Sequence, residues 1–433
     1  YRSRVDVSRS RSAFIRARHS FMMRLARRCG AALRVSSTRR PVTRRRCPGT
    51  RPRAASARRS ASSWEGVDAW RALPLDERRA WRDADAVEDR RASSSASCAS
   101  SSSSSSLSDD ACLATRARAV LEEACPRRKA ALTHDAYARL ARGEIEVCGE
   151  KYLDTVRTLP NRPARPEKPR LVSPKEVPSP KNSPLGPTAH VVHGLAHVEL
   201  NAVDLAWDTV ARFASLRGVL PDQFFIDFAH VADDESRHLL WCLQRLEELG
   251  VSYGDVPAHD VLWEGAEATA NDPLARLAVV PCMQEARGLD AGPRLAERLV
   301  GHGDNVSAAI VRRISEEELG HVAVGAAWFR EVCDALSSPE SGSDERADDD
   351  DGIAAATFRA YIHRLAPGSL RGPFNVDDRA RAGIHPSWYA EDAKTSVPVA
   401  RPPRLVARDP ALVRKLRDRL EHVVAIETGA SNA

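Results

Sequence analysis

Residues 228–240 read FAHVADDESRHLL, and residues 314–326 read ISEEELGHVAVGA. Each stretch contains a Glu-x-x-His motif, formed by Glu235 with His238 and by Glu318 with His321. Residues three apart lie on one face of an α-helix, so both side chains of a pair can reach one metal ion. Either motif alone is weak support for a metal site, because a chain with thirteen His contains such pairs by chance.

The placement of the two motifs is more informative than their presence. Around each motif, apolar residues recur every three or four positions, which predicts the buried face of a helix. The two apolar stripes consist of Phe224, Phe228, Val231, Cys242 and Leu249, and of Ile310, Ile314, Gly325, Trp328 and Val332. Both motifs lie within these stripes, so we expect them to point into a protein core rather than to form a solvated charged face.

Two further glutamates also occupy apolar stripes. Glu199 is flanked by Val192, Leu195, Ala202, Ala206 and Phe213, and Glu285 by Ala278, Cys282, Leu289 and Leu299. Burying four carboxylates without a cation would be costly or would force most of them to protonate. The order Glu, Glu-x-x-His, Glu, Glu-x-x-His is the ligand order of ferritin-like di-iron and di-manganese carboxylate proteins.

We therefore predict a site for two iron ions, or for a Mn/Fe pair. Its expected ligands are Glu199, Glu235, His238, Glu285, Glu318 and His321. The alternative is a bundle in which the buried Glu and His side chains satisfy one another by hydrogen bonds.

Residues near the ligands suggest a supporting layer. Asp204 and Asp290 each follow a predicted ligand, Glu199 or Glu285, by five residues. Either aspartate could accept the second ring N–H of a ligand histidine, which would orient the imidazole, or could simply be a surface residue.

Four basic side chains near the predicted ligands have two interpretations each. Arg237 and Arg287 could pair with buried acids or could be structural or exposed. His193 and His197 precede Glu199 and could extend the site, although a polar helix entry is the simpler interpretation.

The periodicity predicts an all-α fold, a ferritin-like four-helix bundle over residues 190–335. The expected long helices cover 190–216, 222–249, 272–300 with a kink at Pro281, and 304–335. Outside them we expect short helices at 111–124 and 130–142, a Pro-rich strap at 160–187, a helix at 357–364 and an irregular tail with packing aromatics. The predicted segments are a basic arm (1–64), a disordered Ser-rich linker (65–110), helices with the strap (111–189), the bundle, an acidic disordered insert (336–352) and a C-terminal extension (353–433).

The basic charge of the chain is concentrated before Glu65. This part contains nineteen Arg, no Lys and one acidic residue, Asp6, whereas the net charge of the whole chain is only +6. Such a composition is typical of a transit peptide, so we predict import into a mitochondrion or plastid, with translation starting at Met22 or Met23. The alternatives are an Arg-rich leader without this role, which would leave the protein cytoplasmic, or nucleic-acid binding by the arm.

Two absences in the sequence restrict the class of protein. The nine Cys contain no C-x-x-C pair, which argues against a zinc ribbon. No apolar run approaches the roughly 18 residues that a membrane-spanning helix needs.

Several stretches resemble a known family. They include residues 197–200 (HVEL), 235–238 (ESRH), 253–260 (YGDVPAHD), 285–290 (EARGLD) and 318–321 (ELGH). With the Pro-rich strap and the stretch 372–375, the likeness spans about 111–395 and is to the ferritin-like domain-of-unknown-function family 455. The ligand order is more distantly similar to that of ferritin-like di-iron tRNA hydroxylases. The resemblance implies the ferritin-like fold and no particular substrate.

The ligand set leads us to expect an O₂-dependent oxidoreductase or hydroxylase. Its partners would be a small-molecule or tRNA-linked substrate and an external electron donor. The alternatives are iron oxidation, storage or buffering without an organic substrate, and a structural metal site in an interaction protein. The sequence does not predict the oligomeric state.

Overall fold

The computed structural model describes residues 64–79, 111–148, 159–217, 220–337 and 350–390. Within these ranges the regular elements are helices, and no strand is present. Isolated bridges, such as the one between Leu171 and Ala258, are the only β-type pairing in the described residues. The prediction of an all-α helical bundle is therefore confirmed.

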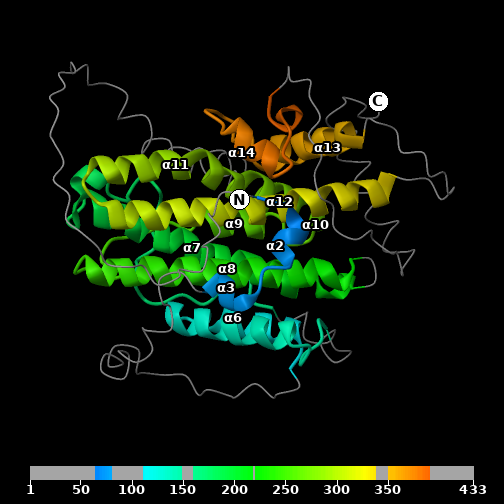
Figure 1. Cartoon of the computed structure of the whole chain (residues 1–433), viewed down its shortest axis with the longest axis horizontal. Helices are drawn as coiled ribbons and strands as arrows, with labels where there is room; N and C mark the ends of the chain where they lie inside the picture. The colour runs from blue at the N-terminus through cyan, green and yellow to red at the C-terminus, as the bar shows by residue number, and fades with distance from the viewer. Residues whose placement is uncertain (1–63, 80–110, 149–158, 218–219, 338–349, 391–433) are drawn as a thin grey trace, which may run out of the picture.

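Four long helical segments form the centre of the molecule (Figure 1). They are α7 (Gly186–Arg212), α8 (Asp222–Glu248), a composite third segment, and α12 (Asn305–Ser337). Helix α7 packs along α8, the third segment packs along α12, and α8 also faces α12. Each helix buries the apolar stripe that the sequence predicts, because only that face can leave water favourably.

The third segment is not a uniform helix. It consists of α10 (Pro273–Val279), a π-helical turn η6 (Val280–Glu285) and α11 (Ala286–Gly301). The turn contains Pro281, where the sequence predicted a kink, and a proline ring inside a helix removes one backbone hydrogen bond. The ring lies against Gly325 of α12, where an added Cβ would come within 2.1 Å of the Pro281 Cβ. The irregular turn thus lies where the third segment and α12 pack closely against each other through Pro281 and Gly325.

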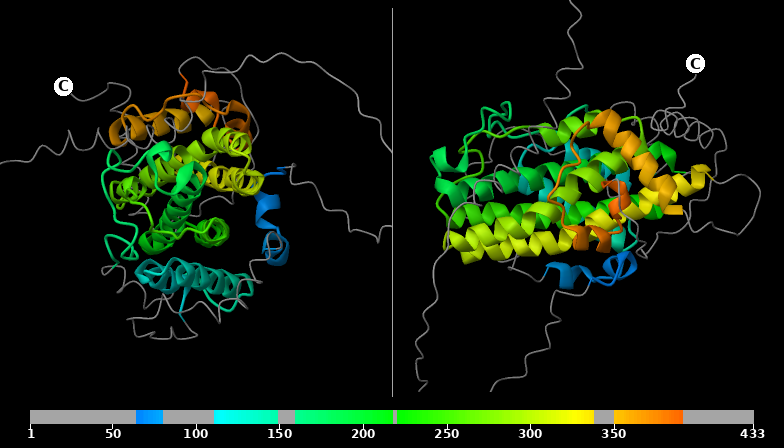
Figure 2. Two further views of the ribbon diagram at one scale, coloured as in Figure 1. Left: turned by 90° about the vertical axis from the view of Figure 1, so that its left-hand side faces the viewer. Right: turned by 90° about the horizontal axis from the view of Figure 1, so that it is seen from above.

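Shorter elements cover this bundle on opposite sides (Figure 2). Helices α5 (Leu113–Glu122) and α6 (Pro126–Ala141) pack on α7 and α8, as expected for two short helices. The Pro-rich strap is irregular apart from η4 (Pro180–Asn182), and α9 (Val261–Glu267) lies in the connection after α8. On the other side lie α13 (Asp350–Leu365), α14 (Val376–Arg381) and η7 (Pro386–Trp388).

Some predicted boundaries were wrong. Helix α7 begins and ends four residues before the predicted limits, and η5 (Ala214–Leu216) follows it. Helix α13 begins seven residues before Thr357, and the tail that we expected to be irregular contains α14. The aromatic packing of this tail is confirmed, because Trp388 is fully buried against Phe329 and Phe358.

The predicted linker at 65–110 was wrong in its first part. Residues 64–79 contain α2 (Val67–Arg71) and α3 (Leu75–Arg79), which lie beside α8 and α12 (Figure 1). Val67 and Trp70 are buried there, and Arg71 binds Asp227 of α8 through two hydrogen bonds of 2.9 and 2.6 Å. The short apolar stretch was hidden by its Arg-rich and Ser-rich surroundings.

Other predicted segments fall outside the described ranges. These are the basic arm, the Ser tract and most of the acidic insert, whose edges belong to α12 and α13. None of the described helices is both long and apolar enough to span a membrane.

Candidate metal centre

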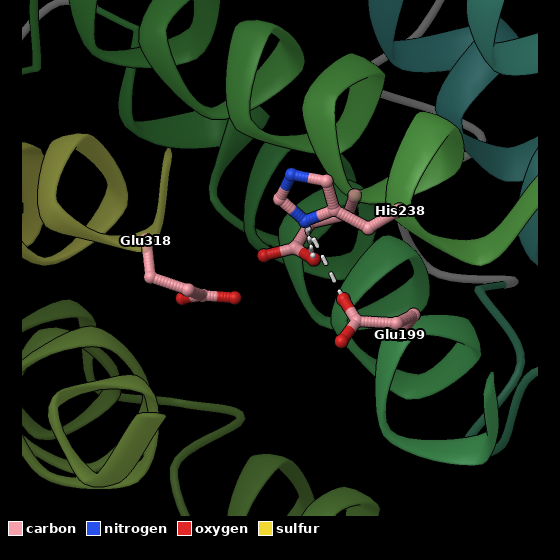
Figure 3. A group of neighbouring side chains, drawn as sticks. Glu199, His238 and Glu318 are labelled. Atoms are coloured by element: carbon pink, nitrogen blue, oxygen red, sulfur yellow. Dashed lines mark ion pairs between the residues drawn. The ribbon is translucent and has the colours of Figure 1, made fainter. Parts of the chain in front are cut away.

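Five of the six predicted ligands meet in the buried centre of the bundle. Glu199 comes from α7, Glu235 and His238 from α8, and Glu318 and His321 from α12, and all five side chains are buried. Glu199, Glu235, His238 and Glu318 each offer a ligand atom, and these atoms lie within 4.8 Å of one another. Figure 3 shows the carboxylate of Glu318 directed toward the side chains of His238 and Glu199. This buried Glu/His group could hold a metal ion.

Glu235 lies between the two imidazoles. Its Oε2 atom is 3.4 Å from His238 Nδ1, and its Oε1 atom is 2.9 Å from His321 Nδ1. Glu199 lies on the His238 side, at 3.5 Å, and Glu318 lies on the His321 side, at 3.8 Å. Two adjacent pairs of carboxylate and imidazole groups therefore have Glu235 in common.

The sixth predicted ligand, Glu285, lies at the edge of this group. It is the last residue of the π turn, is half-buried, and lines the same cavity as Glu199, Glu235 and Glu318. It is not among the four residues whose ligand atoms lie within 4.8 Å of one another. The structure thus brings Glu285 to the cavity that the other carboxylates line, farther from the tight group.

Each histidine is held from behind by an acid of the other helix. His238 Nε2 is 2.9 Å from Glu317 Oε2, and His321 Nε2 is 3.2 Å from Asp234 Oδ2. With Nε2 donating its proton to these carboxylates, the Nδ1 lone pair of each ring faces the centre, as a metal ligand requires.

The predicted supporting aspartates were wrong. Asp204 instead pairs with Lys129 at 2.5 Å and with Arg165 of the strap, and Asp290 pairs with Arg379 at 2.8 and 2.7 Å. An offset of five residues turns a side chain about 140° around a helix from the starting residue, so it cannot share the ligand face.

A signal for the correct acids was present in the sequence. Asp234 and Glu317 each directly precede the Glu of a Glu-x-x-His motif. Each lies four residues before the histidine of its own helix but serves the histidine of the opposite helix. The sequence could point to these acids, whereas the exchange between helices depends on how α8 and α12 pack.

Two buried arginines balance the acids behind the histidines. Arg237 donates to Glu317 at 2.8 Å and also to Asp234, and Arg78 of α3 donates to Asp234. Burial alone would raise the pKa of Asp234, but the two guanidinium groups hold it well below its usual range. Burial likewise opposes ionisation of Glu317, yet Arg237 lowers its pKa to about 2. Both acids are therefore carboxylates, and the pairing of Arg237 with buried acids is confirmed.

Three other basic residues lie away from the ligand group. Arg287 donates to the Arg371 carbonyl at 2.6 Å and also forms an ion pair of 3.8 Å with the buried acid Asp290, as one of its two interpretations allowed. His193 Nε2 accepts from the backbone N–H of Gly254 at 2.9 Å. His197 Nδ1 lies 2.8 Å from the Tyr253 hydroxyl. The two histidines therefore fasten the connection after α8 to α7 and do not extend the candidate site.

The electrostatics of the ligand group suit a cation. Burial raises the pKa of Glu199 well above its usual range, and burial also raises that of Glu318. Burial would lower the pKa of His238, but the carboxylates around it raise that pKa well above its usual range. Protons on these side chains thus substitute for missing positive charge, which divalent cations would supply.

Buried atoms at the centre lack hydrogen bonds. These atoms are Glu199 Oε2, both oxygens of Glu235, Glu318 Oε2, and Nδ1 of His238 and His321. They approach one another as ion pairs, but none has hydrogen-bond geometry with a partner in the described part of the chain. A group of inward-facing oxygen and imidazole nitrogen atoms is a donor set that iron and manganese accept.

A cavity opens on the carboxylates from the side of α7 and α11. Its volume is about 890 Å³, including space open to solvent. Apolar side chains form most of its walls, among them Val191, Leu195, Val198, Leu205, Leu295 and Ile314. The carboxylates are therefore approached through mostly apolar surroundings.

Comparisons with known proteins give a family and no activity. The sequence pattern of the family described as "Protein of unknown function (DUF455)" matches residues 122–390. An uncharacterised protein from Haemophilus influenzae is 34% identical over 267 residues, which cover 61% of this chain and 88% of that protein. No solved structure matches.

Proposed function

Because the chain belongs to the family of unknown function DUF455, we propose its function from the centre itself: a ferritin-like, di-iron protein that uses O₂ to oxidise a small organic molecule. The single observation that carries this proposal is that two Glu-x-x-His pairs and Glu199 converge at the inner wall of an apolar cavity. A Mn/Fe pair is the variant of the same proposal.

The charges support two ions rather than one. Glu199, Glu235, Glu285 and Glu318 carry four negative charges when ionised, and two divalent cations would balance them. Asp234 and Glu317 are already balanced by Arg78 and Arg237, so they do not need the cations. Glu235 lies between the two histidines, so its two oxygens would be available to both ions.

Two ferrous ions at this position would bind O₂ and supply electrons for its reduction. The protein's own residues have three tasks around that chemistry. Glu317 and Asp234 keep the proton of each imidazole on Nε2, which leaves Nδ1 free to ligate. Glu235 holds the two ligand sets together, and the apolar walls of the cavity exclude water from the reacting molecule.

The cavity also favours organic oxidation over iron storage. Iron that enters and leaves as a hydrated ion needs a polar route, whereas the walls leading to these carboxylates are mostly apolar. An apolar access route is what a hydrophobic substrate requires.

The test begins with metal content and O₂ consumption of the Fe²⁺-loaded protein. We expect two iron ions per chain, with O₂ uptake that the Glu235→Ala variant abolishes. The matched control is Glu122→Ala, which changes an exposed glutamate of α5 and should leave both quantities unchanged. Uptake of many tens of iron ions per chain would establish storage instead, and metal-free protein under all conditions would exclude the proposal.

A further inference from the structure

The cavity beside the candidate centre is elongated. Its lining on α7 runs from Val191 to Leu205, a rise of about 21 Å for a helix of this length. Glu199 lies near the middle of that span, so space continues along α7 on both sides of the carboxylate. A molecule that fills the cavity is therefore longer than it is wide, with its middle at the centre.

Small residues open this space between the two helix pairs. Gly194 and Ala202 lie on the α7 wall, and Gly288 and Gly292 lie on the α11 wall. An added Cβ at Gly288 would meet Glu318 at 3.7 Å, an ordinary contact, so a larger residue there would occupy space directly beside this carboxylate. The opening thus depends on several positions that carry little or no side chain.

The described residues that line the cavity include no Lys, Arg or His, so none of these side chains is cationic. The ionisable groups that face the cavity are the four glutamates Glu199, Glu235, Glu285 and Glu318. Two divalent ions would already be balanced by these four carboxylates, so an additional anionic group would find no cationic side chain among the described lining residues to receive it. The cavity therefore favours an uncharged molecule.

One amide interrupts the apolar lining beside the centre. Gln284 is 4% exposed, lies next to Glu285 in the π turn, and its Oε1 atom has no hydrogen-bond partner among the described residues. Its Nε2 atom lies over Gly265 of α9, where an added Cβ would approach to 2.2 Å. Ser315 also lines the cavity, but its hydroxyl already donates to the Val311 carbonyl at 2.8 Å.

A buried amide oxygen without a hydrogen-bond donor costs free energy. A ligand that donates a hydrogen bond to this oxygen therefore binds more tightly and in a defined orientation. We propose that the cavity binds an elongated, uncharged hydrophobic molecule that carries a hydroxyl group, and that Gln284 hydrogen-bonds this hydroxyl. A hydroxyl can donate its proton to the amide oxygen, which is the atom of Gln284 that lacks a partner among the described residues. Gln284 is then a specificity-determining residue. This inference rests on the proposed function, because it names the substrate class of the same site.

The test measures binding of three probes to the anaerobic, Fe²⁺-loaded protein by calorimetry. The probes are 1-octanol, octyl methyl ether, which lacks the hydroxyl proton, and octanoate. We expect 1-octanol to bind about three- to tenfold more tightly than the ether, as one net hydrogen bond predicts, and octanoate to bind most weakly. The Gln284→Leu variant should bind 1-octanol and the ether equally, with the affinity for the ether little changed.

Two further variants keep the result interpretable. Ala202→Phe fills the cavity on the α7 wall and should weaken all probes together, which places them in this space. Gly265→Ala should displace the Gln284 amide and reduce the preference for 1-octanol, so it replaces Gln284→Leu if that variant does not fold. Tightest binding of octanoate, equal binding of 1-octanol and the ether to the unaltered protein, or no binding of any probe would each overturn the inference.

The outcomes separate this inference from the proposed function. Selective binding of 1-octanol without O₂ consumption would support the proposed class of ligand and contradict the proposed oxidative function. The protein could instead bind two iron ions and consume O₂ but bind none of the probes. That result would support the metal centre and contradict the proposed class of ligand.

Discussion

His321 of α12 is held from behind by Asp234 of α8, with 3.2 Å between Nε2 and Oδ2. The relationship is reciprocal, because Glu317 of α12 holds His238 of α8 in the same way at 2.9 Å. Arg237 joins the two carboxylates by donating to both. The orientation of each imidazole therefore depends on both helices.

The acids behind the histidines should set metal affinity. Replacing Asp234 by Asn, or Glu317 by Gln, removes the carboxylate that fixes the imidazole proton on Nε2. We expect affinity for Fe²⁺ to fall about 10- to 100-fold, the usual effect of such outer partners. Asp290→Asn is the matched control, since Asp290 pairs with Arg379 outside the centre and should leave metal affinity unchanged. An unchanged affinity in Asp234→Asn would contradict the role given to this pair.

Removal of the metal should destabilise the bundle. Without cations, Glu199 and Glu318 must protonate or attract water, since burial raises the pKa of both. We expect chelation to lower the melting temperature by at least about 5 °C, which corresponds to a few kcal/mol for a domain of this size. The Glu235→Gln variant should melt at one temperature with and without metal. Equal melting of the unaltered protein in both states would indicate a polar core that satisfies itself.

Two N-terminal deletions should differ in their effect on stability, because residues 64–79 contact the bundle and residues 1–63 have no described contact with it. Deletion of residues 1–63 removes none of the described contacts and should leave the melting temperature unchanged. Deletion of residues 1–79 also removes Trp70, which stacks on His230 with ring centroids 3.6 Å apart, and the ion pair between Arg78 and Asp234.

The longer deletion exposes a buried carboxylate behind a ligand, so we expect lower stability and weaker metal binding. Melting curves and metal titrations of the two deletions should therefore differ. A 1–79 deletion that behaves like the 1–63 deletion would show that α2 and α3 add nothing.

Acid should loosen the connection after α8. Burial lowers the pKa of His193 to about 4 and that of His197 to about 3, and both rings bind this connection as neutral groups. The unfolded chain takes up protons on these residues near pH 6.5, whereas the folded chain does not until lower pH. The free energy of unfolding that these two neutral histidines contribute is therefore fully present above about pH 6.5. It is lost as the pH falls toward their folded pKa values of about 4 and 3.

His197→Gln should reduce this loss. One histidine of this kind costs about 1.4 kcal/mol of stability between pH 7.5 and 5.5. Urea unfolding at the two pH values should show a smaller difference for His197→Gln than for the unaltered protein. His302→Gln, which changes an exposed histidine just beyond the end of α11, is the control and should follow the unaltered protein. Identical pH dependence in all three proteins would contradict the assignment.

The sequence predicted the bundle and the ligand group because both depend on local periodicity. Glu235 and His238 share a helix face in any α-helix, and their apolar neighbours determine that this face is buried. The acids behind the histidines could not be assigned in the same way. Asp234 and Glu317 reach histidines about eighty residues away along the chain, which follows only from the packing of α8 against α12.

The π turn was the other feature that periodicity could not supply. Pro281 indicated an irregularity, but its form depends on the space that Gly325 leaves on a different helix. Trp70 illustrates the opposite problem, because a buried side chain stood in a stretch whose composition suggested a linker. Trp70 packs directly against Gly320 of α12, where an added Cβ would lie 2.7 Å from the indole.

The π turn at Val280–Glu285 also makes the fold and the candidate centre genetically separable. A turn of this kind accommodates one residue more than an α-helix, and each residue rotates the following part of a helix by about 100°. A deletion of one codon in this turn could therefore be absorbed as regular α-helix. The bundle would persist, while side chains inside the turn, such as Gln284, would change direction relative to the cavity. Descendants of one ancestral gene could in this way share the scaffold and differ in whether they retain its chemistry.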